Sequence, residues 1–185
     1  MTKIGIILGS TRPGRNGEAV AKWVDKQAQK RSDATFELVD IADYKLPLLD
    51  EPSPAMMQQY TKDHTKVWSK KISEFDGFIF VTAEYNHNIP GALKNAIDYL
   101  NVEWKNKAIG FVAYGSAGGT RSVEALRLVA AELHMADVRA QVMLNLFTDF
   151  ENMSVFTPDP RHEDSLNDVF DQVIAWSTAL KTLRV

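Results

Sequence analysis

Five short apolar runs recur along this chain, and a segment with apolar residues at helical spacing follows each of them. The runs at 4–8, 78–81 and 108–113 are apolar throughout, as in strands buried on both faces. The runs at 35–39 and 138–144 alternate apolar and polar residues, as in partly exposed strands. The intervening helices are expected at 19–28, 67–75, 92–100, 123–133 and 166–180. Regular alternation of strand and helix predicts an α/β fold, a parallel sheet with helices on both faces.

The texture of the strands also predicts their order. Alternating strands at the edges and apolar strands inside favour the order 2-1-3-4-5, a doubly wound, five-stranded, flavodoxin-like sheet. In such sheets a ligand binds beyond the carboxyl ends of the strands, where the winding reverses between strands one and three. The loops after Leu8, Thr82 and Tyr114 are therefore the candidate binding loops.

Composition limits what the ligand is. With 185 residues, 45% hydrophobic and 24% charged, the chain has the make-up of a globular protein, and we expect one domain over 1–185. A net charge of -3 gives no reason to expect nucleic acid or an anionic membrane as a partner. The absence of cysteine excludes disulfides, thiolate catalysis and cysteine metal sites.

Location and metal content follow from what the chain lacks. No apolar run is long enough to span a bilayer and no leader precedes the first strand, so a cytoplasmic protein is expected. His64, His134 and His162 are scattered without metal-ligand spacing, so no metal site is predicted.

The first loop has the make-up of an anion site. Residues 9–17, GSTRPGRNG, place hydroxyls, glycines and two arginines between a strand and a helix N-terminus. A phosphate requires free backbone N–H groups, the helix dipole and guanidinium donors. The loop matches neither the dinucleotide G-x-G-x-x-G nor the G-x-x-x-x-G-K-[ST] pattern. We expect Asn16 to cap the helix, and the alternative is a surface helix whose polar residues act only as caps.

The other two loops offer flat and polar surfaces. Residues 84–88, EYNHN, directly follow a buried strand and present an aromatic ring and amide donors to a planar heterocycle. Residues 115–120, GSAGGT, contain three glycines, which let backbone approach a flat ring closely. A solvated turn and a flexible connector explain each loop taken alone. Their common place at the ligand-binding edge favours a ligand.

These residues resemble a known family. The segments GSTR at 9–12, EYN at 84–86 with IPGALKNAID at 89–98, and GSAGG at 115–119 look like the NADPH-dependent FMN reductase family, which includes chromate, quinone and azo-dye reductases. The resemblance covers nearly the whole chain in order and spacing. One departure is Ala83, where the family usually has proline, and it bears on the rigidity of the loop.

The resemblance implies a non-covalently bound FMN, with its phosphate in the first loop and its isoalloxazine ring between the other two. The cofactor-binding residues that it implies are Ser10, Arg12, Arg15, Asn16, Gly17, Glu84, Tyr85, Asn86, Gly115, Ser116, Ala117, Gly118 and Gly119. We expect a backbone N–H near Asn86 to bond N5 of the flavin. The N–H groups of 116–119 are expected to face the pyrimidine end.

The implied activity is an FMN-dependent NAD(P)H oxidoreductase. NADPH or NADH would reduce the flavin by hydride transfer, and two electrons would pass to a quinone, an azo compound, a metal oxyanion or free flavin. No side-chain acid or base is required. His87 is a candidate proton donor to a reduced quinone, although a loop histidine is more commonly just solvated. Arg121 is expected to be a surface arginine rather than a site for the NADPH 2'-phosphate.

Two other functions fit the same fold and cofactor. A flavodoxin-type electron carrier exchanges single electrons with protein partners, but such carriers are typically more acidic than -3 and have hydroxyl-rich first loops. A non-catalytic flavin-binding sensor differs from the enzyme only in lacking NAD(P)H oxidation.

The segment 41–60 is the least regular part of the sequence. Three prolines keep it out of regular structure, yet it carries LPLL at 46–49 and two adjacent methionines. It is too apolar for a plain exposed loop, so we expect it to cover the flavin or to form a subunit contact. The resemblance implies a homodimer, or a tetramer built from dimers.

Overall fold

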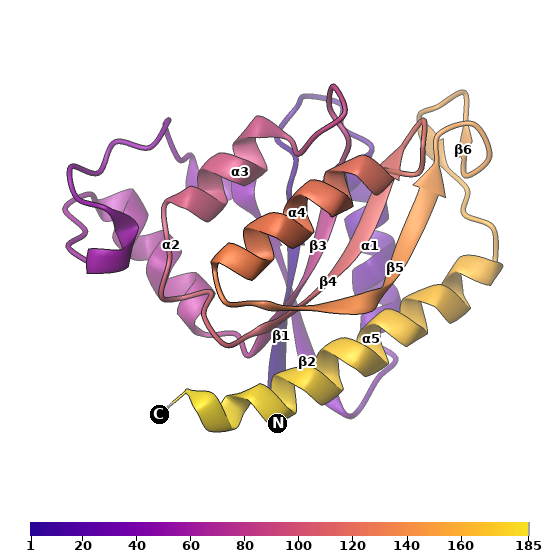
Figure 1. Cartoon of the computed structure of the whole chain (residues 1–185). Helices are drawn as coiled ribbons and strands as arrows, with labels where there is room; N and C mark the ends of the chain where they lie inside the picture. The colour runs from indigo at the N-terminus through magenta and orange to yellow at the C-terminus, as the bar shows by residue number, and fades with distance from the viewer. Residues whose placement is uncertain (185) are drawn as a thin grey trace.

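A five-stranded parallel sheet forms the centre of the molecule, which a computed structural model describes over residues 1–184 (Figure 1). The strands are β1 (Thr2–Leu8), β2 (Ala34–Asp40), β3 (Gly77–Ala83), β4 (Ala108–Gly115) and β5 (Ala136–Asn145). Their order is β2-β1-β3-β4-β5, and every pairing is parallel. The flavodoxin-like order predicted from the sequence is confirmed. The expectation of one domain stays a prediction, and residue 185 lies outside the described part.

The burial of the strands explains this order. Every residue of β3 and β4 is buried, and these strands lie inside the sheet. The edge strands β2 and β5 carry exposed or half-buried positions between buried ones. Strands with apolar residues on both faces are stable only where helices cover both faces, so the apolar runs had to lie inside.

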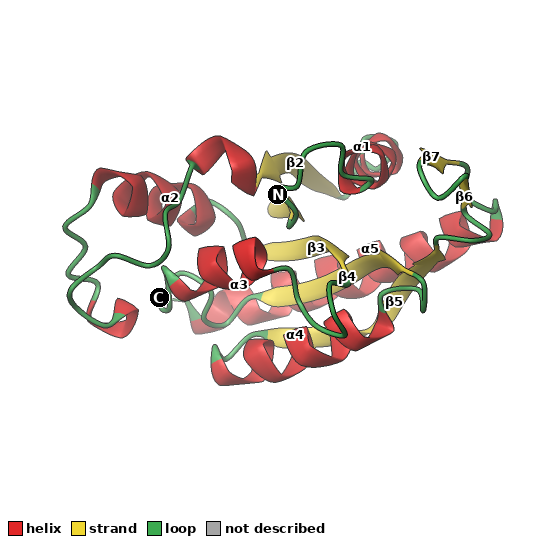
Figure 2. Ribbon diagram, turned by 90° about the horizontal axis from the view of Figure 1, so that it is seen from above, coloured by secondary structure: helices red, strands yellow, loops and turns green. Residues whose placement is uncertain are grey.

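The helices divide between the two faces of the sheet (Figure 2). They are α1 (Gly17–Ala28), α2 (Asp63–Ser73), α3 (Gly91–Asp98), α4 (Thr120–Glu132) and α5 (Arg161–Leu180). Helices α1 and α5 pack on one face in one apolar core. Helices α2, α3 and α4 pack on the other face in a second core. Each expected helix is confirmed, with boundaries shifted by a few residues.

The second core is built around two tryptophans. Trp68 and Trp104 are each 1% exposed. Burial on this scale stabilises the fold by about 1.5 to 3 kcal/mol for each large apolar side chain. Each indole satisfies its N–H on α3, with Trp68 donating to the Ala96 carbonyl at 2.8 Å and Trp104 to the Ile97 carbonyl at 3.1 Å. The Trp68 bond holds α3 against α2, and the Trp104 bond holds the segment that follows α3 against the end of that helix.

Several short elements were not predicted. They are the 3-10 turns Ile41–Tyr44, Ala55–Met57 and Lys181–Leu183, and a hairpin of β6 (Phe150–Glu151) with β7 (Val155–Phe156). The segment 41–60 projects beside α2 at one end of the molecule, and the hairpin lies beyond β5 at the other end (Figure 1). Both elements follow an edge strand.

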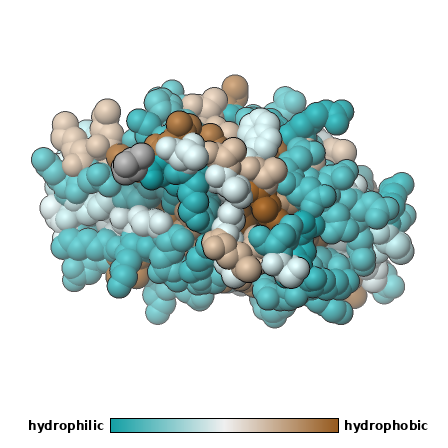
Figure 3. Space-filling model, turned by 90° about the horizontal axis from the view of Figure 1, so that it is seen from below, coloured by the Kyte–Doolittle hydropathy of each residue, from teal (hydrophilic) through white to brown (hydrophobic). Residues whose placement is uncertain are grey.

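The end of the sheet where the strands begin is closed by ionic contacts. Asp76 accepts from the Lys3 backbone at 2.9 Å and pairs with Lys181 at 2.8 Å and Arg184 at 2.7 Å. Burial pushes the pKa of Asp76 upward, but these bonds hold the pKa below its usual value. Hydrophilic residues dominate this end, with hydrophobic atoms confined to small spots (Figure 3).

Candidate functional site

Three loops meet at the carboxyl edge of the sheet, after β1, β3 and β4 (Figure 2). Backbone bonds join them, since Gly9 donates to the Val81 carbonyl at 2.9 Å and Glu84 donates to the Tyr114 carbonyl at 3.2 Å. The parallel order places these three ends side by side. The structure brings together the three loops that the sequence singled out, and their role as binding loops stays a prediction.

The first loop leaves its backbone donors free. Within residues 1–184, the backbone N–H groups of 11, 12 and 14–16 donate to no protein acceptor. Arg12 is exposed beside them. Gly14 has φ of +66°, a left-handed conformation that suits glycine, and open space surrounds its Cα. Free N–H groups at a helix N-terminus next to a guanidinium form a donor set for an anion.

Arg15 differs from Arg12, because its guanidinium is already engaged. It pairs with the carboxylate of Asp40 at the end of β2 and donates to the carbonyl of Ser10. The Arg15 side chain is 12% exposed. This contact closes the loop against β2, so Arg15 shapes the loop in this conformation, and its predicted contact with phosphate stays a prediction.

Ser10 and Gly17 lie beneath the loop rather than on its surface. The Ser10 hydroxyl is buried and lies 3.3 Å from the hydroxyl of Tyr114. A Cβ on Gly17 would lie 2.6 Å from that tyrosine hydroxyl oxygen, so only glycine fits without a shift. Burial raises the pKa of Tyr114 above its usual value. These residues support the loop from below, and their predicted contact with FMN is not tested by this arrangement.

Asn16 occupies the predicted cap position, but the cap itself is wrong. Its side chain makes no capping bond to the first turn of α1. The side-chain amide instead donates to the carbonyl of Met153 at 2.8 Å. The N-terminus of α1 therefore has no side-chain acceptor, because the asparagine is used to hold the β6–β7 hairpin.

The second loop is a tight two-residue hairpin. Tyr85 and Asn88 exchange backbone bonds of 3.0 and 3.1 Å, and between them Asn86 and His87 have φ of +50° and +69°. Left-handed φ at both central residues marks a type I′ turn, for which asparagine is suited. The N–H of Asn86 has no protein acceptor within the described chain. It is thus free to serve as the predicted donor to a ligand.

Glu84 links the second loop to α4. Its carboxylate accepts from the Arg121 backbone N–H at 3.1 Å and forms an ion pair with Arg121 Nε at 2.9 Å. The Glu84 side chain is 6% exposed. The guanidinium continues to His87, donating from Nη1 to Nδ1 at 3.0 Å. Arg121, expected to be a plain surface arginine, therefore ties the second and third loops together.

The third loop owes its shape to two glycines. Gly118 and Gly119 have φ of +66° and +71°. A Cβ on Gly119 would lie 2.6 Å from Ala113 Cβ and 2.8 Å from the Tyr114 backbone nitrogen. Ser116 is exposed, and within residues 1–184 the N–H groups of 116 and 117 donate to no backbone acceptor. The loop thus presents backbone donors without bulky side chains.

The connection from β5 to α5 borders the first and third loops, and sequence reasoning missed it. Asn145 Nδ2 donates to the Ser116 carbonyl at 3.2 Å. Asp149 is 2% exposed and accepts from the Asn145 backbone at 2.8 Å and His162 Nε2 at 2.9 Å. Burial pushes the Asp149 pKa up, but these bonds and the Asp159 backbone bond hold the pKa below its usual value. The aspartate after an alternating strand was the signal available in the sequence.

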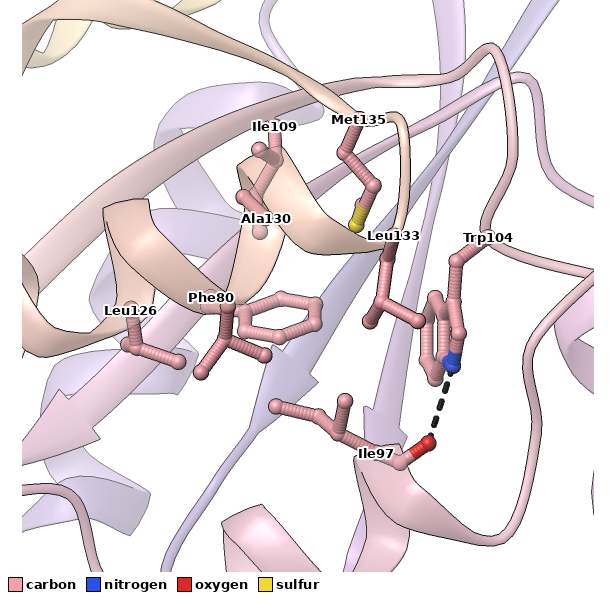
Figure 4. A pocket seen from close by; sticks show the side chains of 9 residues that line it. Phe80, Ile97, Trp104, Ile109, Leu126, Ala130, Leu133 and Met135 are labelled. Carbon is pink, nitrogen blue, oxygen red and sulfur yellow. Dashed lines mark hydrogen bonds between the residues drawn. The ribbon is translucent and has the colours of Figure 1, made fainter.

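Clefts border the loops on two sides. One of about 340 Å³ lies beside Thr11, between the segment 41–46 and α3. Another of about 500 Å³ lies beside His87 and Arg121 along α4. By contrast, a void of about 10 Å³ inside the second core, under Phe80 and Trp104, is at the limit of what one water fills (Figure 4). That void is a packing gap and not a ligand site.

Residues 1–184 contain neither a cluster of metal-binding side chains nor a helix suited to a bilayer. No three His, Asp or Glu side chains gather there as ligands of a metal ion. None of the helices in that range combines the length and the apolar character needed to cross a membrane.

Comparison with known proteins identifies the family. The family model for NADPH-dependent FMN reductase matches residues 2–149. The chain belongs to this family. An NAD(P)H-dependent FMN reductase of Nectria sp is 46% identical over 128 residues, which cover 66% of this chain and 64% of that protein. The chain thus spans just under two thirds of that relative's length.

Other similar proteins cover more of the chain. A 2-hydroxy-1,4-benzoquinone reductase of Burkholderia sp is 30% identical over 179 residues, covering 95% of this chain and 87% of that protein. The structure of FerB, a flavoenzyme NAD(P)H:(acceptor) oxidoreductase of Paracoccus denitrificans, has a TM-score of 0.75 at 19% identity. The structural match covers 97% of this chain and 98% of the FerB chain, and this likeness bears out the fold. The resemblance to the FMN reductase family stated from the sequence is confirmed.

Proposed function

We propose that this FMN reductase family member is an FMN-dependent NAD(P)H oxidoreductase that passes two electrons to a small-molecule acceptor. The observation that carries the proposal is the open donor set of the three loops. Backbone N–H groups at 11, 12 and 14–16, at Asn86 and at 116–117 lack protein acceptors within the described residues and lie around one edge. Unpaired backbone donors at one place are costly unless water or a ligand satisfies them.

The donor set fits the two ends of FMN. The first loop and Arg12 match a phosphate, which accepts hydrogen bonds and carries negative charge. The free Asn86 N–H and the third loop match the polar edges of a flavin ring, and half-buried Tyr85 offers an aromatic face beside them. The predicted binding set keeps its place in the proposal, with Ser10, Arg15 and Gly17 as residues that shape the first loop.

The protein's part in the reaction is to bind, orient and polarise. FMN, when bound, supplies the two-electron chemistry between nicotinamide and acceptor. Arg12 and the first-loop N–H groups would hold its phosphate. The Asn86 N–H and the donors of 116–117 would anchor the ring edges and bias its electron affinity. No side-chain acid is needed for hydride acceptance, and NADPH and NADH both remain candidate donors.

The acceptor class is proposed from the family. Quinones, azo compounds, metal oxyanions and free flavin are the candidates, and the quinone reductase of Burkholderia, a relative aligned over 95% of the chain, favours a quinone. We place the enzyme in the cytoplasm, where both nicotinamide donors are available.

The proposed assembly is a homodimer, or a tetramer of dimers. Leu48, Met56 and Met57 are 85%, 69% and 57% exposed on the segment 41–60. This segment is held in place, because Asn95 of α3 and Tyr99 directly after that helix donate to the Pro47 carbonyl at 2.7 and 3.1 Å. A fixed apolar surface suits a subunit contact. Sedimentation of the wild type and of Leu48→Glu tests it, and a monomeric wild type would contradict it.

The decisive experiment is spectroscopic. The protein is purified, loaded with FMN and mixed with NADPH or NADH without oxygen. Bleaching within seconds, followed by recovery on adding a quinone, is the expected result. Bound flavin that does not bleach would favour the electron carrier or the sensor. Failure to bind FMN would overturn the assignment of the three loops.

A further inference from the structure

Arg121 stands between the two loops proposed to hold the flavin ring. From the third loop's helix it reaches Glu84 at 2.9 Å and His87 at 3.0 Å, both in the second loop. The Glu84 carboxylate is almost fully buried, and it also accepts the Arg121 backbone N–H at 3.1 Å. We call these three residues the Arg121 bridge. Charge-assisted bonds of this kind are short and directional, so the bridge fixes the spacing of the two loops.

The bridge determines which nitrogen of His87 carries the proton. A guanidinium has five N–H donors and no acceptor. Because Arg121 Nη1 donates to His87 Nδ1, that nitrogen must hold a lone pair. The imidazole is then neutral, with its proton on Nε2. His87 is exposed, and its Nε2–H has no protein acceptor within residues 1–184. The bridge thus produces a fixed hydrogen-bond donor at the mouth of the candidate site.

The charges around this donor disfavour an anionic ligand. His87 and Arg121 line the cleft along α4 together with Glu124, Arg127 and Leu128. Both arginines are already paired, Arg121 with Glu84 and Arg127 with Asp137. Glu124 adds a negative charge that is exposed. A neutral carbonyl oxygen fits this donor better than a phosphate does, so this cleft is not suited to the NADPH 2'-phosphate.

We propose that His87 is a catalytic residue for carbonyl-type acceptors, donating a hydrogen bond from Nε2 to a quinone oxygen, with Glu84 and Arg121 as positioning residues. This rests on the proposed reductase function. Reduction of a quinone adds two electrons and one hydrogen as hydride, and negative charge develops on the second oxygen. His87 stabilises that charge and keeps its proton, and water supplies the proton that completes the hydroquinone. A neutral histidine acting as electrophile is an established mode of catalysis.

The test compares two oxidants, of which only one has a carbonyl oxygen that His87 would hydrogen-bond. Reduced holoenzyme is mixed in a stopped-flow instrument with 1,4-benzoquinone or with ferricyanide, which takes one electron and no proton. The quantity measured is the ratio of the two flavin reoxidation rates. One hydrogen bond contributes about 0.5 to 1.5 kcal/mol, so His87→Ala and Arg121→Met should lower the ratio by about two- to thirteenfold. His87→Gln, which keeps an N–H donor, should recover part of the loss.

Arg127→Met is the matched control. Arg127 lies on the same helix and lines the same cleft, but it pairs with Asp137 instead of the second loop. Its ratio should equal the wild-type ratio. An unchanged ratio in His87→Ala, or an equal fall in Arg127→Met and Arg121→Met, would overturn the proposal.

The tautomer is measured independently by long-range proton–nitrogen NMR of histidine-labelled protein, with His87→Gln assigning the signal. A proton on Nε2 in the wild type is expected, and a proton on Nδ1 would overturn the bridge. The enzyme is reduced with dithionite for the oxidant test, so the ratio is obtained even if NADPH and NADH fail to bleach the flavin. Failure of the proposed function and failure of the bridge are therefore seen separately.

Discussion

The N-termini of α1 and α4 lie at the same edge of the sheet. They differ in whether the protein supplies a side-chain acceptor for the backbone N–H groups of the first turn. At α1 no side chain accepts from the first turn, and exposed Arg12 lies beside the free N–H groups. At α4 the Glu84 carboxylate accepts the Arg121 N–H at 3.1 Å. Both ends carry the same partial positive charge. One is neutralised by the protein itself, and the other is left for an anion from outside.

The different charges at the two N-termini bear on where the phosphate end of the proposed FMN would bind. A phosphate at α4 would meet the negative charge of Glu84 at once. At α1 it meets Arg12, while Asp40 is already paired with Arg15. Like charges repel and opposite charges attract over this range, more strongly where water is excluded. We therefore expect the proposed FMN to bind in one orientation, with its phosphate at the first loop.

The largest predicted effect concerns the glycine at each of these ends. Gly119→Ala should destabilise the protein by about 2 to 5 kcal/mol, since a Cβ there meets backbone at 2.8 Å in a left-handed conformation. Gly14→Ala has the same sign of φ but open space, so about 1 to 2 kcal/mol is expected. Urea unfolding of the FMN-free proteins measures both. Equal losses would mean that packing at α4 is no tighter than at α1.

The second prediction concerns removal of the exposed Arg12 guanidinium beside the α1 N-terminus. Arg12→Ala should weaken FMN binding by about 1.5 to 3 kcal/mol, or about 10- to 150-fold in Kd, because a charge-assisted bond to phosphate is lost. Arg139→Ala, on β5, removes one exposed positive charge elsewhere and serves as the control. FMN titration by fluorescence quenching measures both. If the control loses as much, overall charge and not a phosphate contact explains the effect of Arg12.

Whether a feature of the fold or of the candidate site could be predicted from the sequence depends on how far apart the interacting residues lie along the chain. The sheet order followed from the pattern of apolar residues within each strand. An inner strand is buried on both faces and is apolar throughout, whereas an edge strand alternates apolar and polar residues. The three loops followed from the topology and their small, polar residues. The family resemblance named FMN, and the family match supports it.

Contacts between distant segments were not available. Asn16 was assigned a cap from its position, but its amide reaches Met153, which lies 137 residues away. Arg15 and Arg12 are alike in sequence, and only Asp40 at the end of another strand makes them different. Arg121 likewise depends on Glu84, 37 residues away. Local patterns predict elements, whereas partners of charged side chains depend on the assembled edge.

The third prediction opens the closed end. Glu84→Gln should destabilise the FMN-free protein by about 1 to 2 kcal/mol, since a charge-assisted bond and the complement to the α4 dipole are weakened in a buried place. Asp137→Asn, which alters the Arg127 pair of the same helix, is the control. Because the Asp137 side chain is 31% exposed, its loss should stay below about 1 kcal/mol. A larger loss for Asp137 than for Glu84 would show that closing the α4 N-terminus contributes little.

The smallest predicted effect tests whether α1 is truly open. Asn16→Ala should cost the FMN-free protein about 0.5 kcal/mol or less, because only a solvent-exposed bond to Met153 is lost. A capping asparagine would cost about 1 kcal/mol. Thermal and urea unfolding without FMN separate these values, and a full 1 kcal/mol would restore the cap. The same variant titrated with FMN should bind about two- to tenfold more weakly if the amide turns to the phosphate. A loss seen only with FMN would mean that the bound ligand accepts the N–H groups that the protein leaves without an acceptor at the α1 N-terminus. The Glu84 carboxylate plays the same part for the Arg121 N–H at α4.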